Sequence, residues 1–345
     1  MSLAVFTKLD ETTQRKWEEP KLAYKIVCLD VHDPKVREVM NSIVPEGFYL
    51  EMADSYELDE QMDLAGNADF IMAGWAPIPE QMIRSAKKVK LIQKWGIGYD
   101  KIAIDSAREL NIPVAITAGC NAIPVAELTV GLMLSVYRKI PFVDRQLRAG
   151  QWLKTDMRAQ CFMLYQKTIG LVGCGDIGKR VANILSGFEV DICYYDPLRL
   201  SREMEGELHT TYQSFDELIK SSDILTLHLP FNPETKGLFN RAIFSQMKPS
   251  AILINTSRGG IVNEEDLVWA LQEGVIAGAG LDVFAVEPPK PDHPLLKMDN
   301  VVVTCHIGGG VLDNVANVTI HAFNNMKKIL ANEPLPEQDV IVAKE

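Results

Sequence analysis

Three charged residues follow apolar, strand-like runs in the last third of the sequence. Arg258 closes AILINTSR, Glu287 follows LDVFAV, and His306 closes VVVTCH. In open α/β sheets ligands bind at the carboxyl ends of the strands, so polar groups from three strands are expected to converge there. A histidine in that position could be a catalytic base. Taken singly, each of these residues is more often structural or solvated, so it is the joint pattern that indicates chemistry.

A glycine-rich turn lies upstream of these three residues, in TIGLVGCGDIGKRVANIL. Gly173, Gly175 and Gly178 form a G-x-G-x-x-G motif between an apolar strand and an amphipathic helix, and the next strand ends in Asp196. This arrangement is typical of dinucleotide binding, because the glycines permit a tight turn and the helix N-terminus holds the pyrophosphate. A glycine turn in some other α/β sheet is the alternative.

Asp196 indicates which dinucleotide is bound. A carboxylate there accepts hydrogen bonds from the ribose hydroxyls and repels a 2′-phosphate, which favours NAD over NADP. Arg199 weakens that preference slightly. Asp176 places a negative charge at the helix start. We expect Asp176 to contact the cofactor through its backbone alone, and Ile177 to contact it as well.

Strand-like and helix-like segments alternate along the chain, which indicates βαβ units and parallel sheets. The long helical pattern at 125–150 is broken by Pro141, and an amphipathic helix is expected at 312–333. The expected strands are 23–31, 68–75, 90–98 and 112–117 in a first series, and 168–175, 190–196, 223–230, 251–258, 277–284 and 301–306 in a second.

The composition excludes several classes of protein. With 345 residues, 47% of them hydrophobic, the chain can form two domains that each bury a core. A net charge of -11 argues against a broad nucleic-acid surface. No uninterrupted apolar stretch reaches the length of a membrane span, and the N-terminus lacks the apolar core of a signal peptide. Six cysteines without metal-like spacing predict free thiols, no metal site and a cytoplasmic location.

At this point the sequence resembles the D-isomer-specific 2-hydroxyacid dehydrogenase family. The similarity covers roughly residues 25–330. The matching motifs are KWGIGYDKIAIDSARELNI, VAELTVGLMLSVYR, GLVGCGDIG, LHLPFNPETKGLFN, INTSRGGIVNEEDLVWALQEG, GAGLDVFAVEP and VVVTCHIGGG.

The resemblance implies roles for the three charged residues. Arg258 would hold the substrate carboxylate and orient the 2-oxo group, which suits its planar fork of donors. His306 would donate a proton when the keto acid is reduced and accept it when the hydroxy acid is oxidised. Glu287 would bond the other ring nitrogen of His306 and favour its imidazolium form.

The resemblance also implies contacts around the cofactor and the substrate. Asp282 would bond the nicotinamide amide, with a turn-forming acid as the alternative. Ile97 and Gly98 would offer backbone N–H groups to the substrate carboxylate, and Trp75 would offer apolar surface. Further cofactor contacts would come from His228, Pro230, Thr256, Ser257, Arg258, His306, Gly308 and Gly309.

The implied fold is two doubly wound parallel-sheet domains. Residues 22–124 and 312–345 would form a flavodoxin-like substrate-binding domain, residues 125–311 a Rossmann NAD-binding domain, and residues 1–21 a polar leader. Residues 136–152 resemble the dimer contact of the family, so a homodimer is expected.

Two positions depart from the family pattern. Cys305 stands where proline usually precedes the histidine, and the loss of proline is expected to loosen the approach to His306. The Cys305 thiol is expected to pack inertly, with an oxidisable thiol as the alternative. Gln166 stands where glycine is common.

The substrate is less well defined by the sequence. Glu287 disfavours a formate dehydrogenase, since such relatives tend to carry glutamine there and have no proton to move. We expect a small 2-keto or 2-hydroxy acid such as glyoxylate, hydroxypyruvate or a lactate-like acid. Lys94 keeps D-3-phosphoglycerate open as an alternative. An NADH-sensing, corepressor-like binding protein is the alternative from another class.

Overall fold

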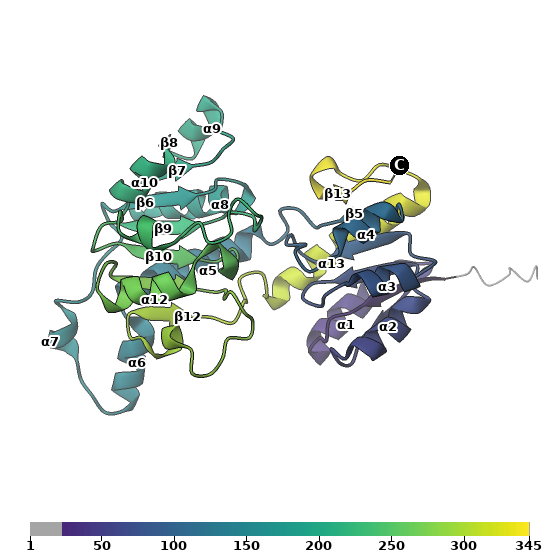
Figure 1. Ribbon diagram of the computed structural model, residues 1–345, viewed down its shortest axis with the longest axis horizontal. Helices are drawn as coiled ribbons and strands as arrows, with labels where there is room; N and C mark the ends of the chain where they lie inside the picture. The colour runs from purple at the N-terminus through teal and green to yellow at the C-terminus, as the bar shows by residue number, and fades with distance from the viewer. Residues whose placement is uncertain (1–22, 345) are drawn as a thin grey trace, which may run out of the picture.

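The computed structural model describes residues 23–344, which fold into two α/β units lying side by side (Figure 1). Each unit is built on one sheet, and both sheets have helices on their two faces. The expectation of two doubly wound parallel-sheet domains is confirmed. The expected leader, residues 1–21, lies outside the described residues. Within residues 23–344 no helix is long and apolar enough to cross a membrane.

The first unit has a six-stranded sheet in the flavodoxin-like order β2-β1-β3-β4-β5, with β13 added at the edge. Its strands are β1 (Tyr24–Cys28), β2 (Phe48–Met52), β3 (Phe70–Ala73), β4 (Leu91–Lys94), β5 (Val114–Ala115) and β13 (Val340–Val342). Its helices are α1 (Pro34–Ser42), α2 (Leu58–Gly66), α3 (Glu80–Ser85), α4 (Ile104–Glu109) and α13 (Val315–Ala331). One core lies under α2, α3 and α4, and the other lies under α1 and α13.

The second unit has a seven-stranded parallel sheet in the Rossmann order, with β6 at the point where the order reverses. Its strands are β6 (Thr168–Val172), β7 (Asp191–Tyr195), β8 (Thr210–Tyr212), β9 (Ile224–Leu227), β10 (Ile252–Asn255), β11 (Gly278–Leu281) and β12 (Val301–Val303). Its helices are α5 (Ala122–Tyr137), α6 (Ile140–Arg148), α7 (Lys154–Met157), α8 (Asp176–Leu185), α9 (Arg202–Glu207), α10 (Phe215–Ser221), α11 (Arg241–Phe244) and α12 (Glu264–Gln272). The central strands are buried on both faces, which explains their unbroken apolar sequences.

The C-terminal part of the chain returns to the first unit. Helix α13 runs out from between the two units and packs against α1 and β4 (Figure 1). The chain then forms β13, which pairs antiparallel with β5. The sequence does not predict this antiparallel edge strand, because a three-residue apolar segment gives little sequence signal.

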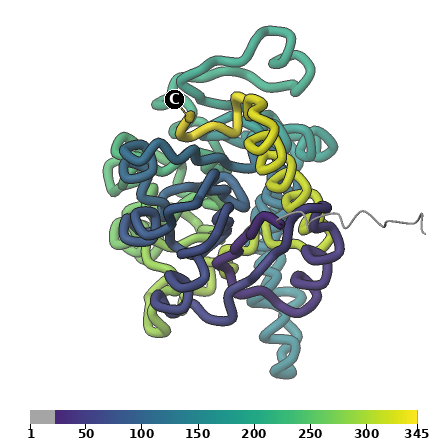
Figure 2. Tube along the Cα trace, turned by 90° about the vertical axis from the view of Figure 1, so that its right-hand side faces the viewer, coloured from purple at the N-terminus to yellow at the C-terminus, as the bar shows by residue number. Residues whose placement is uncertain are grey.

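The long helical pattern at 125–150 is two helices, and its expected break at Pro141 is wrong in detail. Helix α5 ends at Tyr137, and Lys139 adopts the left-handed conformation with φ of 50°. Pro141 lies in the first turn of α6, where the N–H that proline lacks would have no hydrogen-bond partner within the helix. Helix α6 projects from the body of the protein in both views (Figure 1 and Figure 2).

Candidate active site

Arg258, Glu287 and His306 follow neighbouring strands of the second sheet. Arg258 comes shortly after β10, Glu287 after β11 and His306 after β12. Because these strands are adjacent and parallel, their carboxyl ends meet at one edge of the sheet. The fold therefore delivers all three side chains to the edge that faces the first unit.

His306 and Glu287 form a hydrogen-bonded pair. Nδ1 of His306 lies 2.9 Å from Oε2 and 3.1 Å from Oε1 of Glu287, and the N–H of Phe284 donates to Oε1 at 3.0 Å. Burial alone raises the pKa of Glu287, but the hydrogen bonds and the charge of His306 outweigh it and hold that pKa below its ordinary value. Glu287 is therefore ionised at neutral pH, and Nε2 of His306 is left for a substrate.

The turn that carries His306 is held by Asp282. His306 has a φ of 56°, a strained value for a side chain of this size. The Asp282 carboxylate, 1% exposed, accepts hydrogen bonds from Thr304 Oγ1 at 2.6 Å and from the N–H groups of Ile307 and Gly308 at 2.9 and 2.8 Å. Asp282 thus fixes the turn that presents His306.

The Arg258 guanidinium lies on the loop that follows β4 in the first unit. Its Nε donates to Asp100 Oδ1 at 3.0 Å, and its Nη1 donates to the carbonyl of Ser257 at 2.8 Å. Gly98 leaves room for it, since a Cβ there would lie 1.2 Å from Nη2. Among residues 23–344, Nη2 has no hydrogen-bond partner. Sequence reasoning missed Asp100, whose only signal was its place two residues after Gly98.

Trp75 connects the first unit to His306. The two rings meet edge to face with centroids 5.5 Å apart, and Nζ of Lys101 lies 3.1 Å from the centre of the Trp75 ring. Lys101 was also missed, because one exposed lysine in a loop resembles any surface residue. The structure thus places a cation and an aromatic ring next to the predicted proton donor.

Asp30 fixes the loop that presents Trp75. Its carboxylate accepts hydrogen bonds from the backbone N–H groups of Gly74, Trp75 at 2.6 Å and Ala76 at 2.8 Å. Lys94, the candidate anion contact, donates from Nζ to the carbonyl of Gly74, and burial lowers its pKa to about 8. Lys94 therefore has a partner within the loop.

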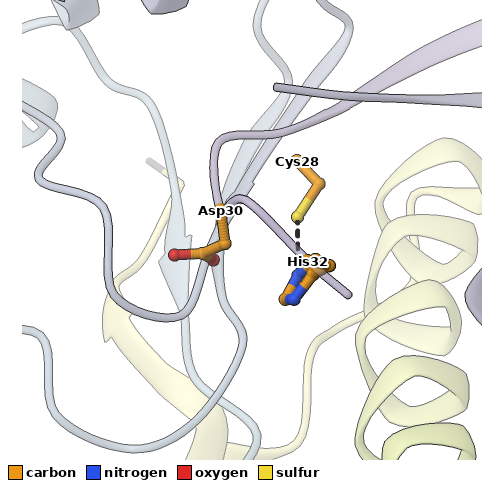
Figure 3. A group of neighbouring side chains, drawn as sticks. All are labelled: Cys28, Asp30 and His32. Carbon is orange, nitrogen blue, oxygen red and sulfur yellow. Dashed lines mark hydrogen bonds between the residues drawn. The ribbon is translucent and has the colours of Figure 1, made fainter. Parts of the chain in front are cut away.

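Asp30 also belongs to a group that has the composition of a metal site. Among residues 23–344, Cys28, Asp30 and His32 have ligand atoms within 4.8 Å of one another. Figure 3 shows that only Cys28 and His32 face each other, with 3.5 Å between Sγ and Nε2, while the Asp30 carboxylate points away toward the loop. Because that carboxylate is occupied by backbone donors, the group does not converge on one point.

The glycine loop between β6 and α8 has the shape that a dinucleotide requires. Gly173 has a φ of 95°, and a Cβ there would lie 2.5 Å from the carbonyl oxygen of His228. A Cβ on Gly178 would lie 2.5 Å from the carbonyl oxygen of Gly173, whereas Gly175 faces open space. The first and third glycines thus allow close packing, and the second leaves room for a pyrophosphate at the start of α8.

Asp196 lies at the ribose end of this loop. It accepts hydrogen bonds from the N–H groups of Cys174 at 2.8 Å and Leu198 at 2.9 Å. Arg199 forms a two-point ion pair with Glu205, at 2.8 and 3.0 Å. Hydrogen bonds from Arg199 and Tyr194 lower the pKa of Glu205 to about 2. Arg199 is therefore engaged elsewhere, which removes the reason to expect a 2′-phosphate.

The other expected cofactor residues differ in whether their side chains have free hydrogen-bonding groups. Burial lowers the pKa of His228 to about 3, and its buried Nδ1 has no partner, so a neutral ring has one free position beside the loop. Thr256 and Ser257 use their hydroxyls within the protein, on Thr129 at 2.8 Å and Asn255 at 2.8 Å. The remaining positions lie around the same loops: Asp176, Ile177, Pro230, Gly308, Gly309 and, in the first unit, Ile97.

The fold and the glycine loop define a class, the α/β proteins that bind a dinucleotide on a Rossmann domain. Residues 130–308 match the model described as D-isomer specific 2-hydroxyacid dehydrogenase, NAD binding domain. The chain belongs to the D-isomer specific 2-hydroxyacid dehydrogenase family, and its cofactor is NAD.

Relatives with different activities resemble this chain. Hydroxypyruvate reductase of Thermotoga maritima is 35% identical over 303 residues, which are 87% of this chain and 97% of that protein. D-3-phosphoglycerate dehydrogenase of Archaeoglobus fulgidus is 35% identical over 289 residues, 84% of this chain and 54% of that protein, so this chain spans about half of that relative. The structure of an NAD-dependent formate dehydrogenase from Staphylococcus aureus in complex with NAD has a TM-score of 0.83 and 30% identity, covering 93% of this chain and 100% of that one.

Proposed function

We propose that this protein interconverts a small 2-keto acid and the corresponding D-2-hydroxy acid. The observation that carries the proposal is the His306–Glu287 pair beside Arg258, at the end of the sheet where the cofactor binds. NADH, when bound, supplies the hydride. With Nδ1 of His306 held by ionised Glu287, Nε2 can give its proton to the oxygen that becomes the hydroxyl group.

Arg258 provides the anchor for the substrate carboxylate in this proposal. Asp100 and Ser257 orient its guanidinium, and Nη2 remains free for an anion. A planar, fixed donor group suits a carboxylate better than a lysine would. The nearby backbone of Ile97 and Gly98 can contribute further donors.

Two features support a small, uncharged substituent on the substrate. Trp75 presents an aromatic ring beside His306, and Lys94 is occupied by the carbonyl of Gly74. The similarity to a hydroxypyruvate reductase agrees with this class of substrate. Formate fits less well as a substrate, because its oxidation to carbon dioxide releases no proton from an oxygen. The reaction would therefore not need the His306–Glu287 pair as an acid-base group.

D-3-phosphoglycerate is the second candidate substrate. Lys101 supports it, because this exposed ammonium group lies on Trp75 and can meet a second anionic group. The similarity to a D-3-phosphoglycerate dehydrogenase agrees with this candidate.

We also propose which unit binds the substrate, which unit binds NAD, and how many chains assemble. The first unit binds the substrate, the second binds NAD, and two chains form a homodimer through the arm of residues 136–152. The six cysteines are unpaired, which favours a reducing compartment such as the cytoplasm.

The deciding experiment is NADH oxidation with glyoxylate, hydroxypyruvate, pyruvate and 3-phosphohydroxypyruvate. We expect turnover on at least one unphosphorylated acid. His306→Gln should lower kcat by roughly 10² to 10⁴-fold. Arg258→Ala should raise KM for the acid by roughly 10 to 100-fold while the Kd for NADH stays within error.

Three other results are informative. A clear preference for 3-phosphohydroxypyruvate would select the second candidate. NADH binding without turnover on any acid would contradict both candidates and favour a cofactor-sensing protein. Full activity of His306→Gln would exclude the proposed proton donor.

A further inference from the structure

Cys120 forms a chain of side-chain contacts with His321 and Asp339, away from Arg258, Glu287 and His306. Sγ of Cys120 lies 3.1 Å from Nδ1 of His321, and Nε2 of the same ring lies 2.5 Å from Oδ2 of Asp339. Cys120 follows β5, His321 lies on α13 and Asp339 directly precedes β13. The order thiol, imidazole, carboxylate is the one that activates a cysteine as a nucleophile.

The Asp339 carboxylate favours the imidazolium form of His321. Asp339 is 0% exposed and also accepts hydrogen bonds from the N–H of Ala118 at 3.1 Å and from Nδ2 of Asn325 at 3.0 Å. A buried carboxylate is stable only with a compensating charge, and His321 is the cation within reach. Hydrogen bonds to Cys120 and then Asp339 outweigh partial burial and raise the pKa of His321 to about 9.

Cys120 is partly exposed, whereas Cys28, Cys174 and Cys193 are buried. Cys120 is half-buried, and the His321 side chain is 25% exposed. Burial raises the pKa of Cys28 and, to about 12, that of Cys174, so these thiols stay protonated. Cys28 does face His32, but the carboxylate beside it, Asp30, points away from that ring (Figure 3).

The position of Cys120 links it to the cofactor loop. Residues 119–121 form one of the two segments that cross between the units, and Asn314 Nδ2 in the other segment donates to the Cys120 carbonyl at 2.9 Å. A Cβ on Gly119 would lie 3.4 Å from the carboxylate of Asp176, the first residue of α8. A change at Cys120 is thus next in sequence to Gly119, the residue that lies beside the first residue of α8.

We propose that Cys120 is a redox-modification site, whose thiolate is stabilised by the adjacent His321 imidazolium and is oxidised by a hydroperoxide such as hydrogen peroxide. The sulfur attacks one peroxide oxygen, an S–O bond forms and the O–O bond breaks. The departing hydroxide takes the proton of the His321 imidazolium and leaves as water. Sulfur loses two electrons and the peroxide gains them, so the products are Cys120 sulfenic acid, water and neutral His321.

Oxidation has a mechanical consequence in this fold. The added oxygen removes the negative charge of the thiolate and lengthens the Cys120 side chain against His321. The crossing segment, which contacts Asn314 and lies beside Asp176, is then displaced. The expected result is weaker NADH binding, by about five-fold or more.

The first test is the pH dependence of alkylation at Cys120. Full-length protein is treated with iodoacetamide between pH 6 and pH 8, and the rate at Cys120 is read by peptide mass spectrometry beside an unstructured cysteine peptide. A thiol with the ordinary pKa near 8.5 slows by roughly 75-fold over this range. We expect less than about five-fold slowing at Cys120. A decline as steep as that of the peptide would overturn the proposal.

The second test separates activation from simple exposure. His321→Gln keeps a polar side chain but cannot hold the proton, so its Cys120 should show the steep decline, with folding checked by thermal unfolding. If that variant does not fold, the wild-type profile decides alone. An unchanged flat profile in folded His321→Gln would contradict the role of His321.

The third test is oxidation itself. Hydrogen peroxide followed by dimedone should label Cys120, the Kd for NADH measured by fluorescence should rise, and Cys120→Ser should abolish both effects. Absence of the Cys120 adduct would overturn the proposal, and an adduct with unchanged NADH affinity would overturn its effect on the cofactor. None of these readouts depends on which acid is the substrate.

Discussion

At the scale of single residues, Glu287 holds the imidazole ring that would move the proton. Its pKa is lowered below the ordinary value, so it is ionised throughout pH 6 to 9 and loses its charge only in acid. A charged carboxylate therefore holds Nδ1 of His306 over the whole of that window. Without the imidazole ring beside it, a carboxylate at position 287 would destabilise the fold, because the side chain is largely buried.

We therefore predict how pH affects the wild type and Glu287→Gln. Reduction of the keto acid should slow as pH rises toward 9, because His306 must carry a proton. In Glu287→Gln we expect a loss of kcat/KM of about ten-fold or more at pH 7.5, because an amide holds the His306 ring without supplying a negative charge. Equal kcat/KM values for the two proteins, measured with chemistry rate-limiting, would show that the charge of Glu287 does not assist the proton transfer.

At the scale of elements, loops of the first unit position side chains of the second. The loop after β4 supplies Gly98 and Asp100 to Arg258, and the loop after β3, held by Asp30, supplies Trp75 to His306. Loops of the first unit therefore help to position active-site side chains that belong to the second unit.

Gln166, by contrast, departs from the family pattern for a reason that lies in its own backbone conformation. It has a φ of 58°, a conformation that glycine adopts without strain, just before β6.

We predict that Gly98→Ala displaces Arg258. A Cβ at Gly98 would lie 1.2 Å from Nη2, so the guanidinium must leave its place on the loop. Misplacing this anchor should lower kcat/KM for the acid by about 100-fold, while the Kd for NADH stays unchanged. Gly66→Ala is the matched control, because a Cβ there meets no atom within 4 Å. An effect of Gly98→Ala no larger than that of the control would be inconsistent with this placement of Arg258.

At the scale of the whole molecule, the arm around α6 is the clearest surface for a second copy of the chain. It projects from the second unit (Figure 1), and it exposes Ile140, Leu147 and Trp152, the last two at 53% and 75%. Contiguous apolar side chains at a projecting helix favour an interface. The homodimer remains a proposal that rests on this surface.

We predict that Leu147→Asp weakens the dimer. Sedimentation at micromolar concentration should give about twice the chain mass of 38.5 kDa for the wild type and a shift toward one chain for the variant. Leu198→Asp is the control, since Leu198 is 82% exposed on another surface. A wild-type mass near that of one chain would refute the dimer, and equal masses for all three proteins would refute this arm as the contact.

The sequence by itself determined the features of this protein that short, contiguous motifs encode. The glycine loop with Asp196, the alternation of strands and helices, and the family were all readable, because each is a short run whose chemistry is set by its neighbours in the chain. Short or half-exposed strands such as β2, β8 and β13 were missed, because they have too few apolar residues to show a clear alternation of apolar and polar positions.

Only the tertiary structure decided which distant residues meet. Arg258 and Asp100 are 158 positions apart, and Cys120 and His321 are 201 apart. No local spacing connects such pairs, because they meet only after the chain has crossed twice between two sheets. The return of α13 and β13 to the first unit is what brings His321 and Asp339 to Cys120, and the facing of the two units is what gives Arg258 its partner.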